Sequence, residues 1–321
     1  MPGSSPGPTD SVAQGENARS MTQPVTASDI PRRGWVARLP GWAQPYARLA
    51  RLDRPIGTWL LLFPCWWGLA LAGSRDLFLY LLFAVGAVVM RGAGCTINDI
   101  IDRDLDGRVA RTADRPLPSG AVTLAGAFAF LALELLLGLG ILLLLKPLAI
   151  WLGLLSLVIV ATYPLMKRIT WWPQIFLGLA FNWGVLMGWA TVRETLTAAP
   201  LLLYLAGIFW TLGYDTIYAH QDKEDDARIG IKSTALRLGA QSRRWIAGFY
   251  AAMVLLMLAA AALVGTLWMA LPLLLLAALH AGWQVWKIDF DDPRDCLAMF
   301  RANRVIGWLV LGAYLVETAL A

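Results

Sequence analysis

Charged residues are scarce in this sequence of 321 residues. Only 15% of the positions are Asp, Glu, Lys or Arg, whereas a soluble domain has about 25%. Cysteine and histidine are scarcer still, with three and two positions. The cysteines show neither a pairing framework nor the spacing of a metal site, which argues against a disulfide scaffold and a zinc protein. We interpret these five side chains as helix-packing residues.

Apolar residues, by contrast, make up 58% of the sequence, and 16 of its residues are tryptophans. Several runs reach the roughly 20 apolar residues that a membrane-spanning helix needs. Because the bilayer core offers no water to the backbone, runs of this length must be helical. The net charge of +5 then reflects basic cytoplasmic loops, and we expect no nucleic acid as a partner. The sequence therefore predicts an all-α membrane protein.

The apolar runs predict nine transmembrane helices joined alternately by long polar loops and short turns. The predicted spans are 56–73, 77–97, 121–145, 147–164, 172–191, 200–219, 245–265, 268–286 and 304–320. The long loops are rich in Lys and Arg, whereas the turns near Arg75, Lys146 and Arg193 hold one basic residue each. Since basic residues mark cytoplasmic loops, the N terminus is predicted to be cytoplasmic. The odd number of spans puts the C terminus on the opposite side.

Two segments precede the membrane domain, which we place at residues 55–321. Residues 1–30 are rich in Pro, Gly, Ser and Thr and lack an apolar run. They predict a disordered N-terminal extension without a signal peptide. Residues 31–54 mix basic and aromatic residues, which is typical of a segment that lies at the membrane interface.

The first of two acidic stretches stands at the cytoplasmic end of the second span. It begins with Asn98, and Asp99, Asp102 and Asp106 follow with spacings of three and four residues. On a helix this spacing places the three carboxylates on one face.

The second acidic stretch stands at the end of the sixth span. Asp215, Asp222 and Asp226 are spaced by seven and four residues, and Tyr218 shares their helical face. Two carboxylate faces that meet would repel each other unless cations lie between them. Mg²⁺ typically takes one or two carboxylates plus substrate phosphates, and neighbouring Arg and Lys side chains bind the remaining phosphate oxygens. The pattern therefore predicts a site for a magnesium-bound diphosphate.

The acidic stretches have three other interpretations. One is a solvated cytoplasmic loop, which two clusters at span ends make less favourable than a single cluster would. A calcium loop starting at Asp102 would need a bidentate Glu at its twelfth position, where Ala113 stands. An ion-coupled transporter would hold its ions near the bilayer midplane, where we expect no acid in this sequence.

Both stretches resemble signatures of the UbiA-type intramembrane prenyltransferases. "NDIIDRDLDGRVARTADRPLPSG" is similar to the first signature, N-D-x-x-D-x-x-x-D, and "GYDTIYAHQDKEDDARIGIKSTALRLG" to the second, which contains D-x-x-x-D. "RLDRPIGTWLLLFPCWWGLALA" and "YPLMKRITWWPQ" resemble the subgroup that prenylates 4-hydroxybenzoate in ubiquinone biosynthesis. The resemblance covers about residues 45–320.

The resemblance implies a nine-helix bundle around a central cavity open to the cytoplasmic side, with two Mg²⁺ ions and an isoprenyl diphosphate. One metal ion would be held by the first acidic stretch and the other by the second. By position, the metal ligands are Asn98, Asp99, Asp102, Asp106, Asp222 and Asp226, and the diphosphate-binding residues are Arg103, Arg115, Lys167 and Arg168.

Arg91 falls within the second span, about two helical turns before Asp99. A charged residue inside a span is costly and is a functional hypothesis by default. Arg91 either pairs with an acid of the bundle or binds the carboxylate of an aromatic acceptor, and Tyr218 is the second residue expected at the acceptor. Asp215 is placed to orient or deprotonate a phenol, so it joins the four aspartates of the two signature cores as a catalytic candidate. Those four are Asp102, Asp106, Asp222 and Asp226.

The implied activity is the Mg²⁺-dependent transfer of a polyprenyl group from polyprenyl diphosphate to 4-hydroxybenzoate, ortho to its hydroxyl. The product would be 3-polyprenyl-4-hydroxybenzoate for ubiquinone biosynthesis. A naphthoate, homogentisate or porphyrin acceptor stays open, as does the transporter. The expected location is a bacterial inner membrane, with membrane lipid around the bundle and the active site on the cytoplasmic side. The prenyl chain length and the oligomeric state stay open.

Overall fold

The computed structural model describes residues 34–107 and 112–320, so the expected extension over residues 1–30 lies outside the described residues. All regular structure within the described ranges is helical. The long helices are α2 (Ile56–Leu71), α3 (Leu77–Asp106), α4 (Leu124–Leu142), α5 (Pro147–Ile169), α6 (Pro173–Arg193), α7 (Ala198–His220), α10 (Ser242–Leu263), α11 (Leu267–Lys287) and α12 (Pro293–Leu320). The short ones are η1 (Trp35–Arg38), α1 (Gln44–Leu49), α8 (Lys223–Ile229), α9 (Thr234–Leu238) and η2 (Gly239–Gln241).

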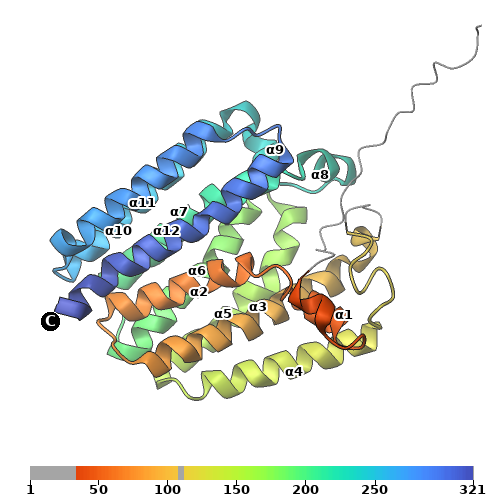
Figure 1. Cartoon of the computed structure of the whole chain (residues 1–321), viewed down its shortest axis with the longest axis horizontal. Coiled ribbons are helices and arrows are strands. Elements are labelled where there is room, and N and C mark those ends of the chain that lie inside the picture. The colour runs from red at the N-terminus through yellow and green to blue at the C-terminus, as the bar shows by residue number, and fades with distance from the viewer. Residues whose placement is uncertain (1–33, 108–111, 321) are drawn as a thin grey trace, which may run out of the picture.

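The expected membrane bundle is confirmed, with one short member. Eight helical segments in the described residues are long and apolar enough to cross a membrane, and α2, with 16 residues, is a shorter apolar helix. The long helices run side by side, and α1, α8 and α9 gather at one end of the bundle (Figure 1). The last helix ends at the opposite end (Figure 1).

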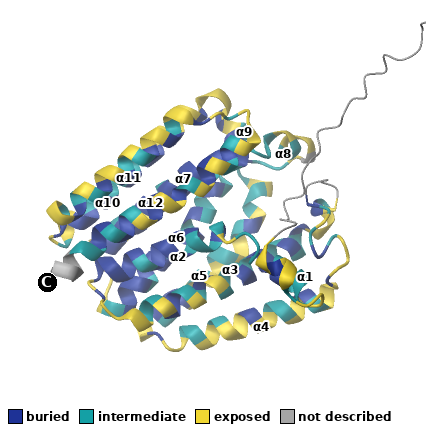
Figure 2. Cartoon of the chain, viewed as in Figure 1, coloured by how far each residue is buried: buried dark blue, intermediate teal, exposed yellow. Residues whose placement is uncertain are grey.

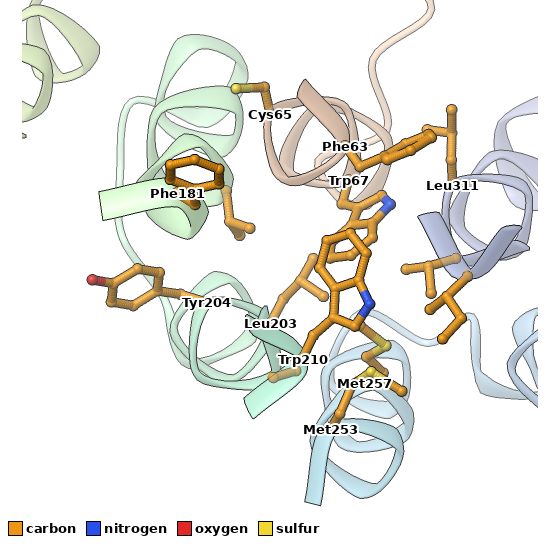
Figure 3. Packing of buried hydrophobic residues seen from close by; sticks show 14 of the residues in the cluster. Phe63, Cys65, Trp67, Phe181, Leu203, Tyr204, Trp210, Met253, Met257 and Leu311 are labelled. Atoms are coloured by element: carbon orange, nitrogen blue, oxygen red, sulfur yellow. The ribbon is translucent and has the colours of Figure 1, made fainter. Parts of the chain in front are cut away.

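Burial divides the bundle into central and peripheral helices. α6 and α7 are mostly buried, whereas α4 exposes most of its surface (Figure 2). In Figure 3, the core side chains of α2, α7 and α10 face one another, among them Trp67, Trp210 and Met257. The rings of Trp67 and Trp210 are 4.9 Å apart, and the Trp67 indole donates a hydrogen bond to the Gly307 carbonyl at 3.0 Å. Aromatic packing therefore joins α2, α7 and α12.

The contact between α2 and α6 depends on glycine. A Cβ atom at Gly68 would meet the backbone carbonyl of Val185, and one at Gly188 would meet the carbonyl of Cys65. Small residues allow helix backbones to approach closely where the hydrophobic effect does not drive association. Neither carbonyl can give way unless the two helices separate.

We expect Gly68→Ala to destabilise the protein by about 1–3 kcal/mol, as overpacking of a filled interior does. Thermal unfolding in detergent measures the effect as a lower Tm. The matched control is Gly140→Ala on α4, because a Cβ there meets nothing within 4 Å. Equal Tm values for the two variants would contradict the close approach of α2 and α6.

Two helices extend well beyond the apolar spans predicted for them. The second span was expected to end at residue 97, but α3 continues to Asp106. The ninth was expected to begin at residue 304, but α12 begins at Pro293, where the Asp292 carboxylate accepts a hydrogen bond from the Arg294 amide at 2.8 Å. Proline at the first helical position after an aspartate is a helix start signal. Apolar length reports the membrane-embedded part of a helix, and both helices extend beyond it.

The expectation that no acid lies near the midplane is wrong. Glu134 stands near the middle of α4 and its side chain is buried. A single acid among leucines does not form a charged cluster, so the search of the sequence for such clusters did not find Glu134. Its partner lies on α3, where Thr96 donates a hydrogen bond to the Glu134 carboxylate at 3.0 Å.

The segment expected at the membrane interface has two different faces. Its described part holds η1 and α1, with Trp35 and Trp42 at 54% and 78% exposure. Leu49 is fully buried in a small cluster with Leu117 and Val122. The segment therefore packs against the loop before α4 while presenting two tryptophans outward.

Candidate functional site

The first acidic stretch forms the last turns of α3. Asp99, Asp102 and Asp106 are all buried, whereas Asp104 between them is exposed. The predicted single helical face is therefore confirmed. Asn98, beside them, is half-buried.

Two cations from the last turn of α5 contact this face. Both Lys167 and Arg168 form ion pairs with Asp102, and the distance from Arg168 Nη2 to the Asp102 Oδ1 atom is 3.1 Å. The Asp102 side chain is only 3% exposed, whereas the two cations are 25% and 45% exposed. The structure thus joins predicted metal-binding and diphosphate-binding residues from two helices.

Two arginines approach the same face from the other side. Arg115 Nη1 lies 2.8 Å from the Asp106 carboxylate and 3.5 Å from that of Asp99. Arg51, which sequence analysis did not single out, donates to Asp99 at 2.7 Å and is itself buried. Its φ of 58° lies in the left-handed region, which costs a non-glycine residue roughly 1–3 kcal/mol. The sequence signal for Arg51 was its place in "RLDRP", just before the first span.

The second acidic stretch is not one continuous helical face, contrary to expectation. α7 ends at His220, and Asp222, with φ −111° and ψ 4°, stands at the position just before the separate helix α8. Acidic residues such as Asp226 fill the first turn of α8, where the positive end of the helix dipole favours them. Because α8 is a separate helix, these acids stand at a helix start, where their negative charges are stabilised. Asp215 stays on α7, close enough to Asp222 for their charges to interact.

Arg91 connects the two halves of the site. Its guanidinium lies over the Phe181 ring, 5.4 Å from the ring centroid, and it interacts electrostatically with Asp215 across the bundle. Arg91 Nε is buried and has no hydrogen-bond partner within the described residues. Tyr163 on α5, which sequence analysis also missed, lines the same cavity as Arg91. A buried donor without a partner costs about 1–3 kcal/mol, so this geometry suits an arginine that binds a ligand.

A cavity of about 660 Å³ begins at Arg91 and Tyr163 and runs between α2, α3, α4, α5 and α6. Its walls are almost entirely apolar and extend as far as Leu145, in the turn after α4. The expected cavity is therefore present, but it lies in the first half of the bundle. Volumes of roughly 300–1,000 Å³ are typical of small-molecule sites.

Two predicted site residues stand apart from these contacts. Arg103 pairs with its neighbour Asp104 at 3.1 Å, and both side chains are exposed, so the structure does not bring it to the acidic face. Tyr218 packs against Phe300, with ring centroids 4.6 Å apart. The roles of Tyr218 and Arg103 at the site both stay predictions.

A surface ion pair tethers the helix that carries Asp226. Lys223, the first residue of α8, lies 2.6 Å from Asp291 in the loop before α12. The hydrogen bond and the positive charge of Lys223 hold the pKa of Asp291 below its usual range. An exposed pair of this kind adds little stability, so it orients α8 more than it stabilises the fold.

The carboxylate oxygens of the two acidic stretches are ligands that a hard divalent cation prefers, but they do not by themselves complete its coordination. Asp99 Oδ2 is buried without a hydrogen-bond partner within the described residues. No group of three or more His, Cys, Asp or Glu side chains in those residues stands close enough to hold a metal ion. Mg²⁺ commonly takes one or two carboxylates and completes its octahedron with water and phosphate oxygens. The residues therefore fit a cation that arrives with a phosphorylated ligand.

The chain matches the model of the UbiA prenyltransferase family over residues 61–310. A 4-hydroxybenzoate polyprenyltransferase, mitochondrial, of Bos taurus is 50% identical over 276 residues, which are 83% of this chain and 73% of that protein. The protein of the same name from Arabidopsis thaliana is 45% identical over 308 residues, covering 94% and 76%. The one from Aedes aegypti is 49% identical over 271 residues, which are 83% of this chain and 62% of that protein.

Solved structures share the fold. The apo structure of a UbiA homologue from Aeropyrum pernix K1 has a TM-score of 0.64 and 26% identity, covering 81% of this chain and 97% of that one. A UbiA homologue from Archaeoglobus fulgidus bound to GPP and Mg²⁺ has a TM-score of 0.67 and 20% identity, covering 86% and 100%.

The fold and the site thus define an integral membrane protein with buried aspartates paired to basic side chains and an apolar cavity that reaches Arg91. The chain belongs to the UbiA prenyltransferase family. The expected bacterial inner membrane finds no support, because the curated relatives are named mitochondrial.

Proposed function

We propose that this chain transfers a polyprenyl group from polyprenyl diphosphate to the ring of 4-hydroxybenzoate, ortho to the hydroxyl. The single observation that carries the proposal is the place of Arg91. Its Nε atom has no hydrogen-bond partner within the described residues, and its side chain lines the apolar cavity. A diphosphate with a long apolar tail and an aromatic acid both find complementary groups there. The names of the curated relatives support this acceptor.

The basic side chains would hold the departing diphosphate. Lys167, Arg168 and Arg115 already lie against buried carboxylates. Charge-assisted hydrogen bonds from such cations to phosphate oxygens are about twice as strong as neutral ones. These residues would therefore stabilise the negative charge that develops as the carbon–oxygen bond breaks.

Two Mg²⁺ ions are part of the proposal. The residues that would hold them are Asn98, Asp99, Asp102 and Asp106 for one ion and Asp222 and Asp226 for the other. When bound, the ions would neutralise the diphosphate and make it a better leaving group. The Mg²⁺ in the Archaeoglobus fulgidus structure supports the use of a divalent cation.

The acceptor would lie between Arg91 and Asp215. A planar guanidinium binds a carboxylate with two parallel hydrogen bonds, so Arg91 would hold the acid group of 4-hydroxybenzoate. Asp215 would orient the phenol or take its proton as the ring attacks the allylic carbon. The rings of Phe181, Tyr163 and Tyr218 would offer their faces to positive charge on the prenyl group.

The apolar cavity would receive the polyprenyl tail. Its walls offer no polar group that would need water, apart from those at the Arg91 end and Ser156. We further propose that the basic end of the bundle faces the cytoplasmic side and that the segment of residues 31–54 lies on the membrane surface there. Trp35 and Trp42 would then sit at the headgroup level.

The deciding experiment uses the purified full chain in detergent. Polyprenyl diphosphate and 4-hydroxybenzoate are supplied with Mg²⁺ or with EDTA, and the prenylated ring is identified by mass spectrometry. We expect product only with Mg²⁺. Parallel reactions with a naphthoate, homogentisate and a porphyrin test the other acceptors. Prenylation of one of these in place of 4-hydroxybenzoate would overturn the proposed acceptor, and no product with any of them would overturn the enzyme.

A further inference from the structure

Glu134 is an unusual residue for the helix that carries it. α4 buries only Ala127 and Glu134, while Leu133 and Leu136 beside Glu134 are 52% and 66% exposed. An ionisable side chain in a membrane span is costly. A leucine would avoid the cost of placing an ionisable group in the span. The contacts of the carboxyl must therefore explain why Glu134 stands there.

The carboxyl of Glu134 lies where three elements meet. Thr96 on α3 is fully buried and donates to it at 3.0 Å. The carboxyl also fills the space beside Gly92, because a Cβ atom there would collide with Glu134 Oε1. Ala50, directly after α1, borders the same space, since its Cβ would lie 3.2 Å from a Cβ at Gly92. Glu134 thus docks α4 onto α3 at the point where the chain leaves α1.

This docking point is directly connected to the acidic face. Gly92, Thr96 and Asp99 follow one another on α3 at steps of four and three, so they share one side of the helix. Ala50 precedes Arg51, which donates to Asp99 at 2.7 Å.

The connection between the two helices also depends on this contact. Residues 112–123, the described part of the connection between α3 and α4, carry Arg115, which reaches back to Asp106 and Asp99. The position of α4 on α3 therefore sets where this segment ends. It thereby sets where the Arg115 guanidinium stands.

We propose that Glu134 is a positioning residue for the diphosphate site. Its hydrogen bond with Thr96 fixes α4 against α3 and thereby holds Arg51 and Arg115 on the Asp99 carboxylate. The proposal rests on the proposed function in that the acidic face is taken to bind the diphosphate.

Four variants test the hydrogen bond itself. Glu134→Leu and Thr96→Val remove it, while Glu134→Gln and Thr96→Ser keep an acceptor and a donor of similar reach. We expect the first two to lower kcat by roughly ten-fold and to raise the Mg²⁺ requirement, as loss of an outer partner of a metal site does. The KM for 4-hydroxybenzoate should change less than about two-fold. Glu134→Gln and Thr96→Ser should restore kcat to within about three-fold of the wild type.

The matched control is Thr191→Val, which removes a buried hydroxyl from α6 that, among the described residues, bonds to its own helix alone, at the Met187 carbonyl. It should leave kcat and the Mg²⁺ requirement unchanged. If Glu134→Leu does not fold, the Thr96→Val and Thr96→Ser pair still decides the matter. Wild-type kcat and Mg²⁺ dependence in Thr96→Val would overturn the proposal, as would a Glu134→Gln variant as impaired as Glu134→Leu.

A binding measurement separates this proposal from the proposed function. The Tm of each variant is measured with and without Mg²⁺ and inorganic pyrophosphate. We expect the Tm rise of the wild type to shrink in Glu134→Leu and Thr96→Val and to persist in Thr191→Val. If the wild type transfers no prenyl group but this pattern holds, the positioning role stands and only the reaction was misassigned. An equal Tm rise in all variants overturns the positioning role, whatever the activity.

Discussion

Replacing Asp102 by Asn is expected to lower turnover by at least about 100-fold. Asp102 is the carboxylate that contacts both Lys167 and Arg168. The substitution keeps the side-chain volume and removes one negative charge from the place where the metal and diphosphate charges are expected to meet. Loss of a single preorganised electrostatic contact typically costs about 10²–10³ in kcat. Steady-state prenylation at saturating Mg²⁺ measures the effect, and size-exclusion chromatography checks that the variant folds.

The matched control for this substitution is Asp104→Asn. Asp104 stands two residues further along α3 but is exposed and pairs only with Arg103 among the described residues. The Asp104→Asn variant should keep wild-type turnover. Asp222→Asn on the second acidic stretch should behave like Asp102→Asn. Near-wild-type turnover in Asp102→Asn or Asp222→Asn would show that the two stretches do not form one metal site.

Arg91→Lys is expected to raise the KM for 4-hydroxybenzoate by roughly ten-fold or more. Lysine keeps the charge but not the planar pair of donors that fits a carboxylate, and a charged hydrogen bond contributes about 1.5–3 kcal/mol. The KM for polyprenyl diphosphate should change far less. Kinetics with each substrate varied separately distinguish the two, and the reverse pattern would assign Arg91 to the diphosphate instead.

Two further variants sharpen the Arg91 experiment. A Cβ atom at Gly57 would stand 2.6 Å from Arg91 Nε, so Gly57→Ala should displace the guanidinium and raise the same KM without touching the charge. Arg193→Lys is the matched control, because Arg193 also lies over an aromatic ring, that of Trp189 at 6.0 Å, but its Nε donates to the Ala72 carbonyl. An unchanged acceptor KM in both Arg91→Lys and Gly57→Ala would contradict the acceptor assignment.

Features that depend on local order along the chain follow directly from the sequence. Long apolar runs specify membrane helices because the bilayer leaves the backbone no other partner. The steps of three and four that join Asp99, Asp102 and Asp106 specify one helical face because the α-helix repeats every 3.6 residues. The same argument from spacing failed at Asp222, because α7 ends at His220 and the next acids belong to a separate helix, α8.

Which groups from distant parts of the chain meet depends on how the helices pack. Arg51 and Asp99 are 48 residues apart in the chain, and Glu134 and Thr96 are 38 apart. Their pairing follows from the way α1, α3 and α4 dock. The place of Arg91 over Phe181, beside the apolar cavity, likewise depends on the packing of both α3 and α6 against α2. Periodicity assigns each residue to a face of its own helix, but which faces meet is settled by close packing between helices, which no local pattern encodes.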